Sequence, residues 1–83
     1  MTLADFSYVI TNIFFKQNIF TSEIHVQEYP EFINVLFTVF YNNSKDYARI
    51  NKLKFICEAI LISLLGKNVH MQLKLAPAST SDI

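Results

Sequence analysis

A ten-residue run of β-branched and aromatic side chains, Phe32 to Tyr41, constrains the fold of this chain more than any other feature. The run contains no glycine, proline or charged residue. That composition is typical of a central β-strand covered on both faces. The competing interpretation is a buried helix with Pro30 at its first position, which would make the protein an all-α bundle. We expect the strand.

The segments before this run have two different periodicities. Apolar residues between Leu3 and Ile13 recur at helical spacing, which predicts a helix over about 3–17. Ile24 and Val26 then alternate with polar residues, as in a half-buried strand. A tight turn at Tyr29-Pro30-Glu31 follows, because proline has no N–H for a ladder.

The second half of the chain predicts a helix followed at once by a strand. Asn43 or Ser44 can cap a helix over about 45–65. Gly66, the only glycine, follows where helices commonly end in the left-handed conformation. From Val69 to Leu75 apolar and polar residues alternate strictly, which indicates a strand.

The predicted fold is therefore α+β, in the order α-β-β-α-β. Two strands joined by a helix lie parallel through a right-handed crossover, with the earlier strand antiparallel beside them. We expect two helices on one face of a small three-stranded mixed sheet. The domain should comprise residues 1–76, with 77–83 as a flexible tail of small and polar residues.

Composition limits the environment and the partners. The 83 residues carry seven basic and seven acidic side chains, so no global field favours nucleic acid or an anionic membrane. The apolar runs Phe32–Tyr41 and Phe55–Leu65 are shorter than the roughly 20 residues needed to span a bilayer. A single cysteine excludes an internal disulfide and fits the cytoplasm or another reducing compartment.

The chain offers little material for catalysis, and we expect no enzyme. One glycine cannot form a phosphate-binding or dinucleotide-binding loop. Cys57 belongs to the apolar stripe of the helix, where a thiol is usually a buried hydrophobe, and Glu58 beside it is expected at the solvated rim. The stripe comprises Tyr47, Ile50, Leu53, Cys57, Ile60, Leu61 and Leu64.

Two weaker patterns concern histidine and basic residues. His25 and His70 occupy similar tetrapeptides on the polar side of their strands. They could hold a metal or report pH if those strands were neighbours, or be surface residues without a role. Lys45, Arg49 and Lys52 share the polar side of the helix, where they steer an acidic partner or are simply solvated.

The predicted interface lies on the strand 32–41. Side chains of a strand alternate between two faces, so one helix layer covers only half of the apolar residues in this run. We expect a protein partner or a second copy to cover the remainder, and the function to be that of a non-enzymatic adaptor or regulatory domain. The predicted interface residues are Phe32, Leu36, Phe37 and Phe40.

The segments Arg49–Ile60 and Val69–Pro77, together with the element order, resemble the BolA family. This resemblance implies a KH-like fold. It places Lys52 and Lys54 at the two arginines of the family's Arg-His-Arg signature, with Leu53 in place of the histidine. It places His70 at a histidine that helps ligate a [2Fe–2S] cluster shared with a monothiol glutaredoxin.

Two alternatives to the adaptor therefore stay open. One is an iron–sulfur or metal-linked partner of a monothiol glutaredoxin that uses His70. The other is an all-helical inhibitor or chaperone-like protein of a phage or secretion system, with residues 30–42 as a buried helix.

Overall fold

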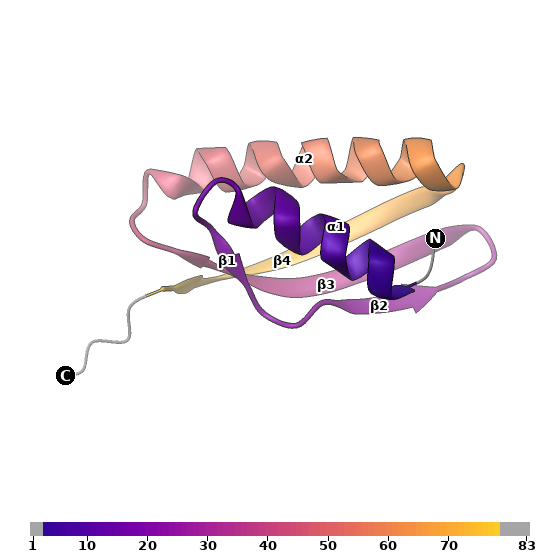
Figure 1. Ribbon diagram of the computed structural model, residues 1–83, viewed down its shortest axis with the longest axis horizontal. Coiled ribbons are helices and arrows are strands. Elements are labelled where there is room, and N and C mark those ends of the chain that lie inside the picture. The colour runs from indigo at the N-terminus through magenta and orange to yellow at the C-terminus, as the bar shows by residue number, and fades with distance from the viewer. Residues whose placement is uncertain (1–2, 79–83) are drawn as a thin grey trace.

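The computed structural model describes residues 3–78 and has an α+β fold (Figure 1). The strand interpretation of 32–41 is confirmed, and the described chain is not an all-α bundle. Neither described helix is long and apolar enough to cross a membrane. The elements are α1 (Leu3–Phe15), β1 (Phe20–Thr21), β2 (His25–Glu28), β3 (Phe32–Tyr41), α2 (Asp46–Leu65) and β4 (Asn68–Pro77).

The sheet is built around β3. β4 pairs with β3 in parallel along all ten residues, from Phe32 opposite Asn68 to Tyr41 opposite Pro77. β2 and β1 pair antiparallel with the other edge of β3, one after the other. The parallel pair joined by α2 and the antiparallel hairpin that precedes it are both as predicted, and the sheet is mixed.

The structure adds a fourth strand, β1, which the sequence did not predict. The register between β1–β2 and β3 shifts by one residue between Thr21 opposite Val39 and His25 opposite Leu36. Ser22 bridges this bulge: its backbone N–H donates to the Thr38 carbonyl, and its hydroxyl accepts from the Thr38 N–H, both at 2.8 Å. A two-residue strand beside a bulge is too short to show an alternating pattern.

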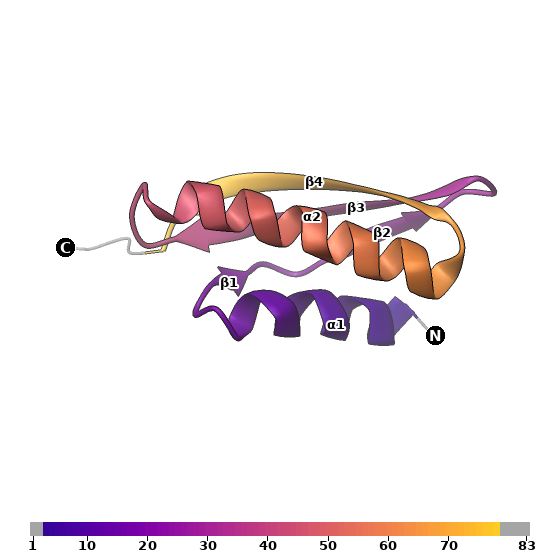
Figure 2. The same cartoon turned by 90° about the horizontal axis from the view of Figure 1, so that it is seen from above.

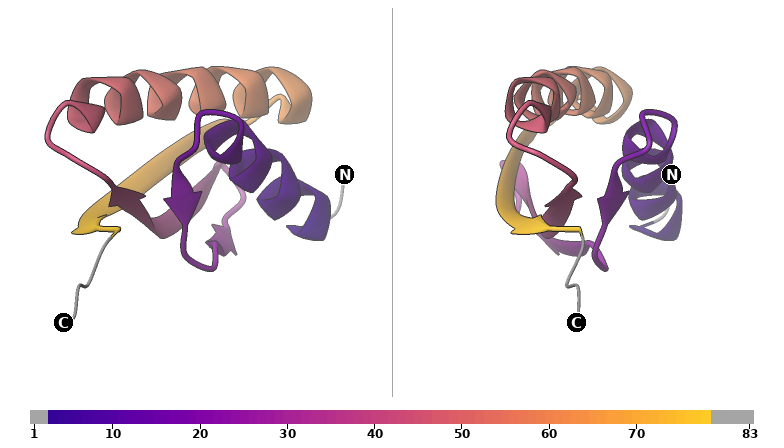
Figure 3. Two further views of the ribbon diagram at one scale, coloured as in Figure 1. Left: turned by 60° about the vertical axis from the view of Figure 1, so that its left-hand side comes forward. Right: turned by 90° about the vertical axis from the view of Figure 1, so that its left-hand side faces the viewer.

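The core lies between the sheet and two helices that pack on the same side of it (Figures 2 and 3). The odd-numbered residues of β3 from Ile33 to Val39 point toward the helices and are buried, as the alternation along a strand requires. Phe37 meets Phe14 of α1 edge to face, with ring centroids 5.7 Å apart. The buried apolar residues are Phe6, Ile10, Phe14, Ile19, Ile33, Val35, Phe37, Val39, Ile50, Leu53, Cys57, Leu61, Val69 and Met71.

The two ends of α2 differ in how far they match the prediction. Gly66 ends the helix at φ 67°, and its N–H donates to the Ile62 carbonyl, as expected. At the other end Lys45 is the N-cap and makes no side-chain cap. The Asn43 side chain instead accepts from the Lys45 N–H at 2.9 Å, one residue before the helix begins.

The C-terminal boundary of the domain was predicted too early. β4 continues to Pro77, and the Ala78 N–H donates to the Tyr41 carbonyl at 2.7 Å. Residues 77 and 78 therefore belong to the sheet. The remainder of the predicted tail, 79–83, lies outside the described residues.

Candidate interaction surfaces

The side of the sheet away from α1 and α2, the open face, carries the even-numbered residues of β3. Three of the predicted interface residues, Phe32, Leu36 and Phe40, are together on it and are half-buried. The polar residues Asn34 and Thr38 separate them. Within residues 3–78, no helix covers this face.

Phe37, the fourth predicted interface residue, is not on the open face. It is 2% exposed and packs against Phe14 beneath α1. Its odd position in β3 directs it to the helices. Including Phe37 in the interface was therefore wrong, because a partner cannot contact it while the domain is folded.

An aromatic cluster occupies one end of the open face. Phe32 stacks on Tyr29 with ring centroids 4.7 Å apart and meets the His70 ring edge-on at 5.0 Å. The Tyr29 hydroxyl donates to the Gln27 side-chain oxygen at 3.2 Å. His70 is consequently held beside an aromatic ring, although it stays exposed.

The two histidines share the open face but are not brought together. His25 is opposite Leu36 on one side of β3, and His70 is opposite Asn34 on the other. Two strand spacings, about 10 Å, and a further offset of two residues along β3, about 7 Å, separate their backbones. Among residues 3–78 no three His, Cys, Asp or Glu side chains gather into a metal-binding group.

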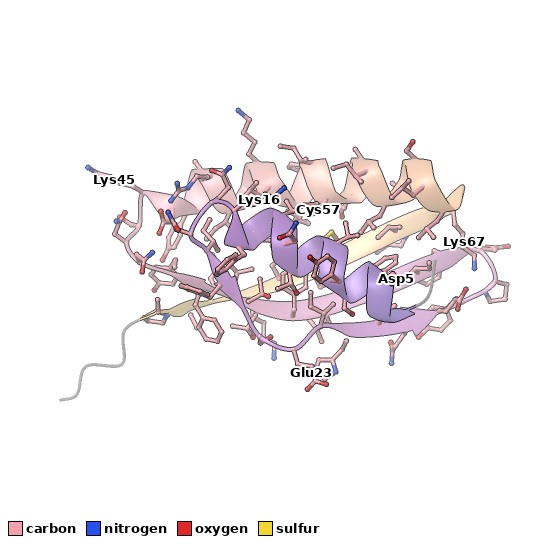
Figure 4. All side chains as sticks on the ribbon, viewed as in Figure 1. Asp5, Lys16, Glu23, Lys45, Cys57 and Lys67 are labelled. Carbon is pink, nitrogen blue, oxygen red and sulfur yellow. The ribbon has the colours of Figure 1, made fainter. Side chains whose placement is uncertain are left out.

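Cys57 is buried between α2 and the sheet, as expected for a core residue, and its sulfur lies beneath the helix in Figure 4. Burial, with a smaller contribution from the Glu58 charge, raises the pKa of Cys57 to about 12. The thiol is therefore protonated and inaccessible near neutral pH. It does not have the properties of a nucleophile.

Glu58 is half-buried and directs its carboxylate toward the edge of β4, where an oxygen accepts from the Met71 N–H at 3.1 Å. The prediction that Glu58 lies at the solvated rim is therefore only partly correct, because its carboxylate also accepts a hydrogen bond from the sheet. An acidic residue inside an apolar helix segment is explained here by a backbone donor that the β3–β4 ladder leaves free.

The outer apolar surface of α2 is the largest departure from the predicted pattern. Five large apolar side chains of α2 are 38–59% exposed: Phe55 and Ile62 lie opposite the buried stripe, and Ile56, Ile60 and Leu64 follow one flank of it at i,i+4 spacing. Ile60 and Leu64 were predicted in the buried stripe, but they belong to this surface, and Tyr47 is 44% exposed. The surface consists of Phe55, Ile56, Ile60, Ile62 and Leu64.

The sequence contained a signal for this surface. A helix with one buried stripe has apolar residues over little more than 100° of its circumference. Phe55, Ile56 and Ile62 fall outside the stripe drawn through Leu53, Cys57 and Leu61. Helix positions that are apolar outside the buried stripe are normally covered by another surface, so these residues form a candidate interaction surface.

The predicted basic residues Lys45, Arg49 and Lys52 are exposed at the N-terminal half of α2. Lys45 projects from the end of the molecule in Figure 4. Arg49 is engaged with Asp46 at 2.7 Å. The exposed side of α2 therefore changes along its length, from basic near the N-terminus to apolar near the C-terminus.

A groove runs between α2 and the edge of β4. Its volume is about 460 Å³. Leu75 is 46% exposed beside it, although it points to the helix side of the sheet. The lining residues are Tyr47, Ile50, Asn51, Lys54, Met71, Gln72, Leu73 and Leu75.

Comparisons with known proteins give no relative: no family model, no curated protein and no solved structure matches this chain.

Proposed function

We propose that this domain is a non-enzymatic protein-interaction module, an adaptor or regulator, that binds a protein partner through the outer apolar surface of α2. The observation that carries the proposal is that α2 is apolar on two sides while the fold covers only one. Leu53, Cys57 and Leu61 are 0–8% exposed on the inner side. Phe55, Ile56 and Ile62 are 38–58% exposed on the outer side.

Size supports this proposal. A domain of about 80 residues buries a smaller fraction of its surface than a larger one, so apolar area left in water is costly to its stability. Burying it against a partner recovers roughly 25 cal/mol for each Å² of apolar area. The neighbouring Lys45 and Lys52 would give the same contact a basic rim.

The open face is a second candidate surface. Phe32, Leu36 and Phe40 are half-buried there rather than fully exposed, and Asn34 and Thr38 lie between them. This mixed composition favours a weaker contact than the more exposed apolar side chains of α2. The two surfaces are on opposite sides of the domain, which suits an adaptor that binds two chains.

The test is a pull-down with mass spectrometry from cells that express the protein, together with sedimentation velocity. A Phe55→Gln/Ile62→Gln double variant should stay folded and lose the partner or self-association found with the unmodified protein. Glutamine keeps helix propensity, so the change removes apolar surface and little else.

Tyr8→Gln is the matched control. Tyr8 of α1 is 70% exposed, against 58% for Phe55, so the control removes an exposed ring that belongs to neither α2 nor the open face. It should keep the interactions. Identical partners and identical sedimentation for all three proteins would contradict the proposal.

The BolA resemblance supports a second candidate function, a cluster shared with a monothiol glutaredoxin. The supporting observation is that His70 is exposed near the start of β4, the position that the resemblance requires. This chain would supply His70 and the partner the other ligands. Co-expression with such a glutaredoxin should then give visible absorbance that His70→Ala abolishes and His25→Ala preserves.

A further inference from the structure

β4 is an edge strand whose outward backbone groups can be assigned. Each residue of a strand directs both its N–H and its C=O to one edge, and the next residue directs both groups to the opposite edge. The Ala78 N–H donates to Tyr41 of β3, whereas the Met71 N–H donates away from β3 to Glu58. Odd-numbered residues of β4 therefore direct their backbone groups outward, and even-numbered residues direct theirs to β3.

This outward edge is closed at two points. Glu58 occupies the Met71 N–H at 3.1 Å. Pro77, the last residue of β4, is also odd-numbered and has no N–H to offer. Long edges are commonly blocked in these ways against unwanted pairing. Between the two blocks, Leu73 and Leu75 retain outward donors and acceptors.

The open part of the edge coincides with the groove beside α2. Leu73 and Leu75 line the groove, together with Tyr47 and Ile50 from the first half of the helix. A strand added to β4 would place alternate side chains in this groove and the others on the open face beside Lys74. Backbone donors and a side-chain cavity therefore occur at the same place.

Charge indicates what such a strand contains. The charged residue lining the groove is Lys54, and no acidic residue lines it. β4 carries Lys74 and no acidic residue. A second copy pairing through the same edge would bring like charges together, whereas a segment with acidic residues on the open-face side complements Lys74.

We propose that the Leu73–Leu75 edge of β4 binds an extended segment of another protein by strand addition, with apolar residues in the groove and acidic residues on the open face beside Lys74. This mode of recognition combines main-chain hydrogen bonds for affinity with side-chain pockets for specificity. The inference rests on the proposed interaction function and adds a second site and the chemistry of its ligand.

The experiment uses a synthetic heptapeptide, acetyl-Glu-Val-Glu-Val-Glu-Val-Glu-amide, titrated into the full chain and followed by NMR. Saturable shifts should centre on Leu73 and Leu75. Amide exchange should slow at those two residues, because their N–H groups gain acceptors. Exchange at Gln72 and Lys74 should change little, because their N–H groups already point toward β3.

Two variants test the two sources of binding. Leu75→Pro removes an outward donor without touching the β3–β4 ladder and should abolish saturable binding. Lys74→Glu keeps the backbone and should weaken binding about fivefold, the size of one cross-strand charge pair. The same peptide with lysine in place of glutamate should bind less tightly to the unmodified protein and more tightly to the Lys74→Glu variant.

Several results would overturn the inference: no saturable binding, shifts confined to the outer surface of α2, or equal binding of the lysine peptide. Exchange protection at Leu73 and Leu75 that rises with protein concentration alone would identify a second copy as the occupant instead. The Phe55→Gln/Ile62→Gln variant should bind the heptapeptide normally. If this variant loses its pull-down partners but the unmodified protein does not bind the peptide, only this inference fails. If the peptide binds but the variant keeps all its partners, only the proposed function fails.

Discussion

The inner and outer sides of α2 have similar residue types but different surroundings. Leucine, isoleucine and cysteine face the sheet, and phenylalanine and isoleucine face water. Only the inner side is aligned with the odd-numbered residues of β3. Residue type alone therefore does not separate the buried from the exposed positions of α2; position around and along the helix does.

This difference explains why a small domain keeps so many large apolar residues outside its core. A surface selected only for solubility would be polar on the outer side of α2. Lys45, Arg49 and Lys52 show that the first half of the helix meets this requirement. The second half does not, and the change occurs within one continuous helix.

The largest expected effect is at Leu61, which is fully buried on the inner side. Leu61→Ala removes methyl groups from a packed site and leaves a cavity, which typically costs about 2–5 kcal/mol of unfolding free energy. Urea denaturation measures this loss. A loss below about 1 kcal/mol would contradict the assignment of α2's inner side as core.

The second prediction compares two thiols on the same helix. In a Cys57→Ser/Ala59→Cys variant the thiol lies on the outside of the helix. Native Cys57 should react with a thiol reagent at least about a hundredfold more slowly than this outer thiol, because reaction at Cys57 requires opening of the core. Its pKa of about 12 also keeps the thiol protonated. Reaction rates with an aromatic disulfide, measured with and without urea, provide the comparison. Equal rates in the folded proteins would show that α2 does not shield its inner side.

Most of the fold was accessible from the sequence because its signals are local. Three signals come from residues close together in the sequence: the alternation from Val69 to Leu75, the glycine at position 66 after the helix, and the apolar run of β3. β1 was missed because its two residues depend on Ser22 and on a bulge opposite Thr38. No local pattern records a register shift.

The candidate sites were less accessible, because they depend on what covers each residue. Ile60 and Leu64 have the spacing of core positions but are 38% and 59% exposed along the flank of the buried stripe. Phe37 was misassigned because interface and core residues alternate along a single strand. The free edge of β4 could be identified only after the bond from Met71 to Glu58 fixed which backbone groups point outward.

A smaller effect is expected at Asp46, a charged residue on the inner side of α2. The Asn42 N–H and the Arg49 guanidinium, both hydrogen-bonded to the carboxylate, hold the pKa of Asp46 below its ordinary value of 3.8. A lowered folded-state pKa stabilises the fold above the unfolded value, and this stabilisation is lost as pH falls through the folded pKa.

The stability difference between the protein and an Asp46→Ala variant should therefore be largest near neutral pH and shrink in acid. Thermal melts at a series of pH values measure it. A difference that stays constant with pH would mean that the ionised carboxylate contributes nothing to the helix start.

The smallest expected effect on stability is at Ile62, which follows Leu61 in the sequence but lies on the outer side of the helix. Ile62→Gln should change the unfolding free energy by no more than about 0.5 kcal/mol, because the side chain is already in contact with water. Urea denaturation beside Leu61→Ala gives a paired measurement on adjacent residues. A large loss at Ile62 would mean that the outer side of α2 is covered within the isolated protein, for instance by a second copy at the concentration used. A small loss would show that Ile62, unlike Leu61, contributes nothing to the core.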